Sequence, residues 1–148
     1  MIWKPNVTVA AIIEQEGKFL LVEEHTSLGI RFNQPAGHLE PDESLLAAVV
    51  REAREETAHE FEPQHLVGIY RWPAPQTDIT YLRFAFAGRT LAFHSERELD
   101  EGIIRAVWLT PQEIRACREQ HRSPLVLRCV EDYLSGKRYP LDLLVHYD

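Results

Sequence analysis

The residues best suited to chemistry lie close together, in a stretch that reads GHLEPDESLLAAVVREAREE over residues 37–56. A helix is expected over residues 45–57, because this segment is rich in Leu, Ala, Val, Arg and Glu and contains no Gly or Pro. At about 100° per residue, Glu52, Glu55 and Glu56 fall within an arc of roughly 100° on its surface. The sequence therefore places three carboxylates side by side on one helix face.

Carboxylates this close repel one another, by a few tenths of a kcal/mol per pair on a bare helix, and raise one another's pKa. A hard divalent cation removes this cost, and carboxylate oxygens are the ligands that Mg²⁺ and Mn²⁺ prefer. Mg²⁺ usually keeps only one or two protein carboxylates and fills its other positions with water and substrate phosphate oxygens. The stretch thus indicates a Mg²⁺ site, with Mn²⁺ as a second possibility, that serves phosphate ester or anhydride chemistry.

An acidic helix face is by itself more often a solvated surface with salt bridges than a metal site. The wider pattern here is much rarer, because it also fixes a Gly, an Arg and a further Glu at set distances from the three carboxylates. A chance match to all of these positions is on the order of 10⁻⁴ over a chain of this composition. The positions are Gly37, Glu43, Arg51, Glu52, Glu55 and Glu56.

These residues resemble the signature of the Nudix hydrolases, in which a Gly is followed by Glu, Arg-Glu, Glu-Glu and a final Gly-aliphatic pair at fixed spacing. The matching stretch, the Nudix box, covers about residues 37–59. It departs from the family at its end, where Ala58 replaces the Gly and His59 the aliphatic residue. A left-handed helix exit costs about 1 kcal/mol more with Ala than with Gly. We expect the departure to affect the helix exit and not the carboxylates.

The resemblance extends over nearly the whole chain and is strongest to the NudJ-type phosphatase branch of the family, with residues 76–102 matching least. It implies Mg²⁺-dependent hydrolysis of nucleoside tri- and diphosphates, and of the pyrimidine pyrophosphate of thiamine synthesis, with release of orthophosphate. Two alternatives stay open. One is an ADP-ribose or nucleotide-sugar pyrophosphatase, weakly favoured by the position of Pro75, and the other is a non-catalytic nucleotide-sensing module.

The family pattern implies which residues bind the metal. Glu52, Glu55 and Glu56 are the expected ligands, and the resemblance adds the backbone carbonyl of Gly37. Glu52 is also the candidate base, because a carboxylate beside a metal ion stays ionised near neutrality and can accept a proton from a metal-bound water.

The residues around the ligands are expected to orient them. Arg51, which the resemblance places in catalysis with Glu52 and Glu55, should pair with Glu43 or with a carboxylate of the box. The acidic loop that precedes the last expected strand lies where many family members supply a further ligand or base. Of its acids we select Glu98, although a solvated loop acid is the more common case for any one of them.

The candidates for substrate contact are scattered along the chain. Arg31 and Arg83 are expected to hold phosphate groups, and Trp72 to stack on a base or a thiamine-type ring. Gln34 and His38 stand next to the start of the box. A surface charge for each Arg, and core packing for Trp72, remain the alternatives.

The composition fits a single domain over residues 1–148 that acts on small molecules. The chain is 45% hydrophobic, which is enough for an ordinary core, and carries a net charge of -7. Because nucleic-acid polymers are held by basic surfaces, we expect a small phosphorylated substrate and no nucleic-acid partner. The sequence shows neither a cleavable signal peptide nor an apolar run of membrane-spanning length, so no membrane partner, a cytoplasmic location and a monomer are expected.

The elements that position these residues can also be read from the sequence. A tight turn at Gly17 joins the first two strand-forming runs, and Ser44 is a plausible N-cap for the box helix. Two later helices are expected to begin at Thr110-Pro111 and Ser123-Pro124, the last one ending at Gly136. The expected strands are residues 7–13, 18–24, 65–73, 79–90 and 103–110.

Strands interleaved with helices, some in antiparallel hairpins, indicate an α/β (α+β) fold in which helices pack on a mixed sheet. The resemblance makes this fold the Nudix α/β/α sandwich.

Overall fold

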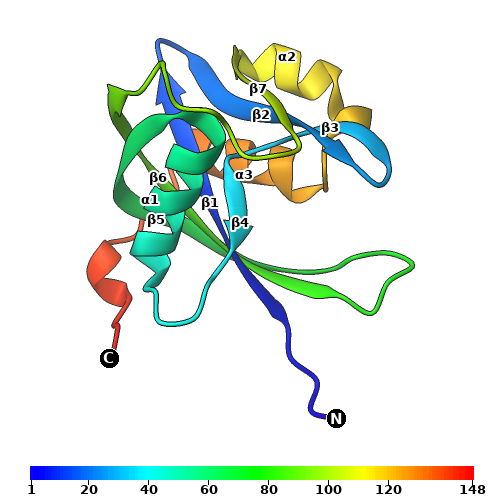
Figure 1. The fold of residues 1–148 in the computed structure, drawn as a ribbon, viewed down its shortest axis with the longest axis vertical. Helices are drawn as coiled ribbons and strands as arrows, with labels where there is room; N and C mark the ends of the chain where they lie inside the picture. Colours follow the sequence, from blue (N-terminus) through cyan, green and yellow to red (C-terminus); the bar gives the residue numbers. More distant parts are fainter.

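The computed structural model describes residues 1–148, and a mixed sheet with helices on both faces forms its centre (Figure 1). The strand order is β3-β2-β1-β6-β5, while β4 pairs with β1 and β7 pairs with β2. The strands are β1 (Asn6–Gln15), β2 (Lys18–Thr26), β3 (Gly29–Asn33), β4 (Ala36–His38), β5 (His59–Pro73), β6 (Thr80–Phe93) and β7 (Ile103–Leu109). The helices are α1 (Leu45–Thr57), α2 (Pro111–Ala116) and α3 (Leu125–Leu134), with short 3-10 turns η1 (Arg118–Gln120) and η2 (Leu141–Leu143).

Strand β1 forms the junction of the sheet. It runs parallel to β6 and antiparallel to β2 and β4, and its hairpin with β2 turns on Glu16 and Gly17, which have φ values of 53° and 79°. These positive angles are those of a two-residue hairpin turn, so the turn predicted at Gly17 is confirmed. Past the hairpin, β2 pairs with β3 and β7 while β1 pairs with β4 and β6, so the sheet divides into two arms.

The alternation of side chains along β1 builds two cores. Val9 and Ala11 lie in one hydrophobic cluster with residues of α1, whereas Ala10 and Ile12 lie in the other with residues of α2 and α3. The helices therefore cover opposite faces of the sheet, and the expected layered α/β sandwich is confirmed. No helix has both the length and the apolar character needed to cross a membrane.

Helix α1 has the bounds that the sequence predicted. Ser44 caps it, since its side chain accepts a hydrogen bond from the backbone N–H of Ala47 at 3.0 Å. At the other end Ala58 has φ 61° and ψ 13°, and its N–H donates to the carbonyl of Arg54. The residue that replaces the family's Gly therefore does adopt the left-handed conformation.

The strand that follows α1 starts earlier than expected. We predicted a strand over residues 65–73, but β5 begins at His59, directly after the left-handed residue. Its first part pairs with the end of β6 through register shifts near Phe61 and Pro63. The polar sequence HEFEPQ does not look like a strand. It forms one because it pairs with β6 and not because of its own residue pattern. The hairpin of β5 and β6 and the N-terminal segment project from one end of the molecule (Figure 1).

The later helices follow their start signals. Thr110 and Glu113 form a capping box at α2, in which each side chain accepts a hydrogen bond from the backbone of the other. At α3 the N-cap position is Pro124, one residue later than predicted, and no side chain caps the helix, although the Ser123 hydroxyl accepts from the N–H of Leu125 at 3.1 Å. Gly136, with φ 94°, follows the end of α3 as expected.

Candidate active site

Strand β4 and helix α1 meet at the Nudix box. The Glu52 side chain is buried against Gly37, so closely that a Cβ atom at residue 37 would overlap its carboxylate. One residue earlier, the N–H of Ala36 donates to Oε1 of Glu56 at 3.0 Å. Gly at position 37 thus lets the backbone of β4 approach the helix, which places its peptide groups beside two carboxylates.

Arg51 is the centre of an ion-pair network. Its Nε and Nη2 donate to the two carboxylate oxygens of Glu43 at 2.9 and 2.8 Å, which is the expected pairing in bidentate form. Its Nη1 donates to Oε1 of Glu52 at 2.7 Å and to Oε1 of Glu55 at 2.9 Å. Nη2 also donates to the carbonyl of His38 at 3.0 Å, so Arg51 fixes both the helix acids and β4.

The three box glutamates share one feature that suits metal binding. In each of them Oε1 accepts a hydrogen bond from the protein, from Arg51 or from Ala36, while Oε2 has no hydrogen-bond partner in the protein. These oxygens are not sealed from solvent, because no buried side-chain oxygen or nitrogen lacks a partner. As the side chains lie, no three acidic, His or Cys groups already converge on one point. The donor set of hard oxygens fits Mg²⁺ or Mn²⁺.

Burial raises the pKa of two of these acids well above the ordinary value. It raises the pKa of Glu52 to about 7, against the opposing effect of Arg51, and the pKa of Glu56 to about 9. The charges of Glu24 and Asp100 raise the pKa of Glu56 further. Ionising all three glutamates is therefore unfavourable without a further cation, and a dication would favour the ionised forms.

The loop before β7 brings a different acid to the box from the one selected. Glu98 is exposed and has no hydrogen bond or ion pair. Asp100 is exposed as well, but its backbone N–H donates to the carbonyl of Glu55 at 2.9 Å, and partial desolvation together with the charge of Glu55 raises its pKa. The structure therefore favours Asp100 over Glu98 as the loop acid nearest the box. Sequence spacing could not separate them, because the loop has no regular period.

The predicted substrate residues fall into separate groups. Arg83 is buried and donates to Oε1 of Gln34 at 2.8 Å, and Gln34 in turn donates to the carbonyl of Val126. Arg31 lies on β3, and its Nη1 donates only to the carbonyl of its neighbour Ile30.

Trp72 and His38, the remaining predicted substrate residues, lie in an aromatic group with Tyr81. Trp72 stacks on Tyr81, with ring centroids 6.0 Å apart and an interplanar angle of 17°, and the His38 ring lies 6.4 Å from Tyr81. Tyr70, a neighbour of Trp72 in sequence, donates to Asp132 instead of extending this stack. Sequence analysis missed Tyr81, although it stands two residues before Arg83 and hence on the same face of β6.

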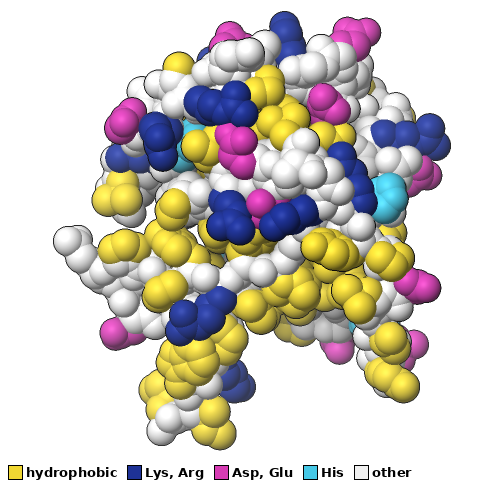
Figure 2. Space-filling view, turned by 180° about the vertical axis from the view of Figure 1, so that it is seen from behind, with side chains coloured by type: hydrophobic (Ala, Val, Ile, Leu, Met, Phe, Trp, Pro, Cys, Tyr) yellow, Lys and Arg dark blue, Asp and Glu magenta, His cyan; other side chains and the backbone are white.

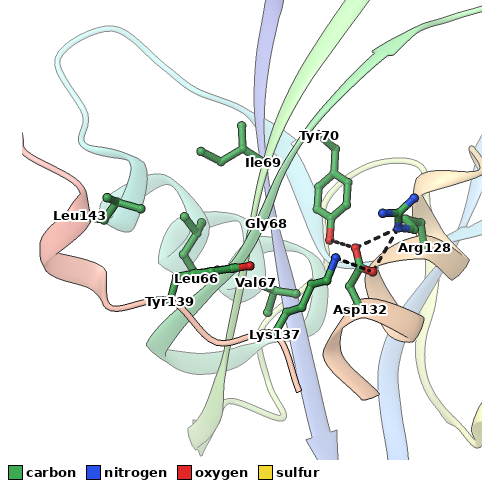
Figure 3. Close-up of a pocket in the computed structure, with 10 residues that line it drawn as sticks. All are labelled: Leu66, Val67, Gly68, Ile69, Tyr70, Arg128, Asp132, Lys137, Tyr139 and Leu143. Atoms are coloured by element: carbon green, nitrogen blue, oxygen red, sulfur yellow. Dashed lines mark hydrogen bonds and ion pairs between the residues drawn. The ribbon is translucent and has the colours of Figure 1, made fainter. Parts of the chain in front are cut away.

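One cavity lies away from the box. It encloses about 360 Å³ between β5 and the C-terminal end of α3. Figure 3 shows Asp132 at its side, held by the hydroxyl of Tyr70, by Arg128 at 3.0 Å and by Lys137 at 3.5 Å. Asp132 is thus paired with two bases, and the three groups together carry one more positive than negative charge.

Comparison with known proteins agrees with the box. A NUDIX domain model matches residues 3–129. Phosphatase NudJ of Escherichia coli (strain K12) is 42% identical over 142 residues, which are 96% of this chain and 92% of that protein. A NUDIX hydrolase from Nitrosomonas europaea shares 56% identity and superimposes with a TM-score of 0.95, covering 97% of this chain and 98% of the other.

A more distant structure, that of a UDP-X diphosphatase, matches with a TM-score of 0.76 at 18% identity, covering 95% of this chain and 68% of the other, which is a likeness of fold alone. The matched family, the NudJ relatives and the box geometry agree with one another. This chain belongs to the Nudix hydrolase family and is a hydrolase.

Proposed function

We propose that the protein catalyses Mg²⁺-dependent hydrolysis of phosphoanhydrides in nucleoside tri- and diphosphates and related small pyrophosphates, with release of orthophosphate. The observation that carries this proposal is the set of three glutamates beside strand β4. In each of them Oε1 accepts a hydrogen bond from the protein and Oε2 has no hydrogen-bond partner in the protein. The 42% identity to Phosphatase NudJ supports phosphatase chemistry. The proposal treats residues 1–148 as one domain, active as a monomer in the cytoplasm and without a nucleic-acid or membrane partner.

In this proposal Glu52, Glu55 and Glu56 hold the metal through Oε2, with the carbonyl of Gly37 as a further ligand. Bound there, a divalent cation would supply charge neutralisation for phosphate oxygens and a water of lowered pKa. Glu52 would accept a proton from the attacking water, because a bound cation would keep its carboxylate ionised near neutrality.

Arg51 and Glu43 orient the carboxylates of the box. Arg51 fixes Oε1 of Glu52 and Glu55, so that the remaining oxygens face outward, and Glu43 holds Arg51 in place by its bidentate pair. In this proposal Asp100, and not Glu98, is the loop acid that supplies a further ligand or base. Its backbone contact with Glu55 brings its charge close to the box.

The experiment is a turnover panel of ATP, GDP, ADP-ribose and the thiamine-pathway pyrimidine pyrophosphate, each with and without Mg²⁺, with products separated by chromatography. We expect orthophosphate from the nucleoside phosphates or from the pyrimidine substrate, and only when Mg²⁺ is present. AMP with ribose 5-phosphate from ADP-ribose alone would establish the nucleotide-sugar alternative. No turnover of any of them would contradict an enzyme of this substrate class and favour the nucleotide-sensing module.

A further inference from the structure

The cavity beside the C-terminal end of α3 is built by three parts of the chain. They are the middle of β5, the second half of α3 and the segment after α3, which joins β5 where Leu66 and Tyr139 exchange backbone hydrogen bonds at 2.9 and 2.8 Å. None of its lining residues belongs to the box. Its volume of about 360 Å³ lies within the range of small-molecule sites, roughly 300–1,000 Å³. The cavity can therefore hold a small organic molecule.

One side of the cavity is apolar. Figure 3 shows Leu66, Ile69 and Leu143 on the side away from Arg128. Ile69 and Leu143 are 51% and 61% exposed, although both are large hydrophobic side chains. Covering them with the apolar part of a ligand removes this surface from water, which favours binding.

The other side is organised by Asp132. Its carboxylate accepts from the hydroxyl of Tyr70 at 2.8 Å and from Nε of Arg128 at 3.0 Å, and Nζ of Lys137 lies 3.5 Å away. Gly68 leaves room for this arrangement, because a Cβ atom there would lie 2.7 Å from the Tyr70 hydroxyl oxygen. One buried acid thus holds two bases at the wall of the cavity.

The charges of this group do not cancel. Burial acts to raise the pKa of Asp132, but the hydrogen bonds from Tyr70 and Arg128 outweigh it and lower that pKa, so the carboxylate is ionised at neutral pH. Arg128 and Lys137 then exceed it by one positive charge, and no other charged residue lines the cavity. Figure 2 shows the molecule from the side of α3, where Lys and Arg side chains border hydrophobic areas of the surface. A surplus cation beside an apolar wall is complementary to an anion with an apolar part.

Both bases keep donors that no protein group uses. Arg128 contacts Asp132 through Nε alone, so Nη1 and Nη2 donate to nothing in the protein. Nζ of Lys137 makes only the 3.5 Å contact. The two side chains are 61% and 42% exposed, so a ligand can reach these donors.

The surplus charge and the free donors match a carboxylate. Two N–H groups of a guanidinium can donate in parallel to the two oxygens of a carboxylate, and an ammonium adds a third donor. A carboxylate carries one negative charge, which equals the surplus. A phosphate monoester carries about −1.5 to −2 at pH 7 and would exceed it.

We propose that this cavity binds a small monocarboxylate with an apolar body, whose carboxylate contacts Arg128 and Lys137. Its hydrocarbon part lies against Leu66, Ile69 and Leu143. This second site is separate from the box and does not depend on the proposed function.

The test is calorimetric titration of the full chain with 3-phenylpropionate at neutral pH and without Mg²⁺. We expect a Kd of about 1 mM or lower, as for a ligand of this size in a partly open site. Acetate lacks the apolar body, 3-phenylpropylamine carries the opposite charge, and benzyl phosphate carries additional negative charge. Each of these three probes should bind more weakly than 3-phenylpropionate.

Substitutions of the three charged residues should act in opposite directions. Arg128→Gln and Lys137→Gln each remove the surplus charge and an anion donor, and each should raise the Kd of 3-phenylpropionate about tenfold. Asp132→Asn keeps an acceptor for Tyr70 but increases the surplus to two charges, so it should lower the Kd. A gain of affinity in this variant cannot come from damage to the fold.

Arg115→Gln is the matched control. It removes an exposed Arg that pairs with Glu131 of α3 but does not line the cavity, so the Kd should stay within about twofold of the wild type. No binding of 3-phenylpropionate, equal or tighter binding of benzyl phosphate, or the same Kd in all three Arg and Lys variants would overturn the proposal. A negative result here leaves the proposed function intact, and an absence of turnover in the substrate panel leaves this site standing.

Discussion

Glu56 is the box residue whose substitution tests metal binding most clearly. One of its oxygens accepts from Ala36, while burial keeps its pKa at about 9. Glu56→Gln retains the shape and the hydrogen bond but removes the carboxyl group that can ionise to bind a cation. We expect turnover to fall by two orders of magnitude or more, with the melting temperature at neutral pH unchanged or higher. Equal Mg²⁺ affinity and rate in this variant would refute the assignment of Glu56 as a ligand.

The raised pKa values of Glu52 and Glu56 also set the pH dependence of stability. Both folded-state values, about 7 and about 9, lie above the ordinary 4.5, so the folded protein retains these protons longer than the unfolded chain. The contribution of the two groups to stability is complete below about pH 4.5 and is lost as the pH rises through 7 and 9. If Mg²⁺ binds the ionised carboxylates, as proposed, it offsets this loss of stability at high pH.

The increase in melting temperature caused by a fixed concentration of Mg²⁺ should therefore be larger at pH 9 than at pH 6. Differential scanning fluorimetry at matched ionic strength measures it, with Ca²⁺-free buffers and the Glu56→Gln variant as the control. An increase that is constant or smaller at pH 9 would mean that these carboxylates do not bind the metal.

A matched pair of substitutions separates the two loop acids. Asp100→Asn should lower turnover about tenfold or more, because its charge acts on Glu52, Glu55 and Glu56. Glu98→Gln should leave turnover within twofold of the wild type, since the charge of Glu98 is not among those that shift the pKa of Glu52, Glu56 or Asp100. Steady-state kinetics at saturating Mg²⁺ make the comparison. The opposite ranking would restore the original choice of Glu98.

At the scale of elements, the end of α1 carries the departure from the family pattern. Ala58 is left-handed and only 2% exposed. Replacing it by Gly removes about 1 kcal/mol of strain but also a buried methyl group and some rigidity of the unfolded chain. Ala58→Gly should thus be neutral or mildly stabilising in thermal unfolding. A loss of several degrees would show that the Ala side chain packs well enough to outweigh the strain.

The helices could be predicted because their signals are local. Ser44, Thr110 and Gly136 act through neighbouring backbone groups, and the run of good helix formers between caps leaves little choice. Strand β4 and the first half of β5 could not be predicted in this way. Ala36–His38 is too short for any periodic pattern, and β5 begins in a polar segment, so both depend on partners far away in sequence.

In the candidate site, too, local features could be predicted from the sequence and features that depend on distant segments could not. The spacing of the glutamates within α1 put them on one face, and the contact of Arg51 with Glu55, four residues further on, follows from that spacing. The identity of Asp100 and the alignment of Arg83 with His38 depend on loop path and strand register. Both are properties of tertiary packing that one sequence does not reveal.

At the scale of the whole molecule, the box joins the two arms of the sheet. Helix α1 packs on β1, β4 and β5 and also contacts β7 of the other arm, while β4 closes against it from the first arm. The carboxylates therefore occupy the place where both arms and the loop before β7 meet. A cation held there would be anchored by elements that are far apart along the chain.

The most direct test of this account is a crystal structure of the protein grown or soaked with Mn²⁺, with the ion located by its anomalous scattering. The account predicts a peak about 2.0–2.2 Å from Oε2 of box glutamates and from the carbonyl oxygen of Gly37. A saturated Mn²⁺ peak elsewhere, with Glu52, Glu55 and Glu56 unmoved and unliganded in a catalytically active crystal, would contradict it.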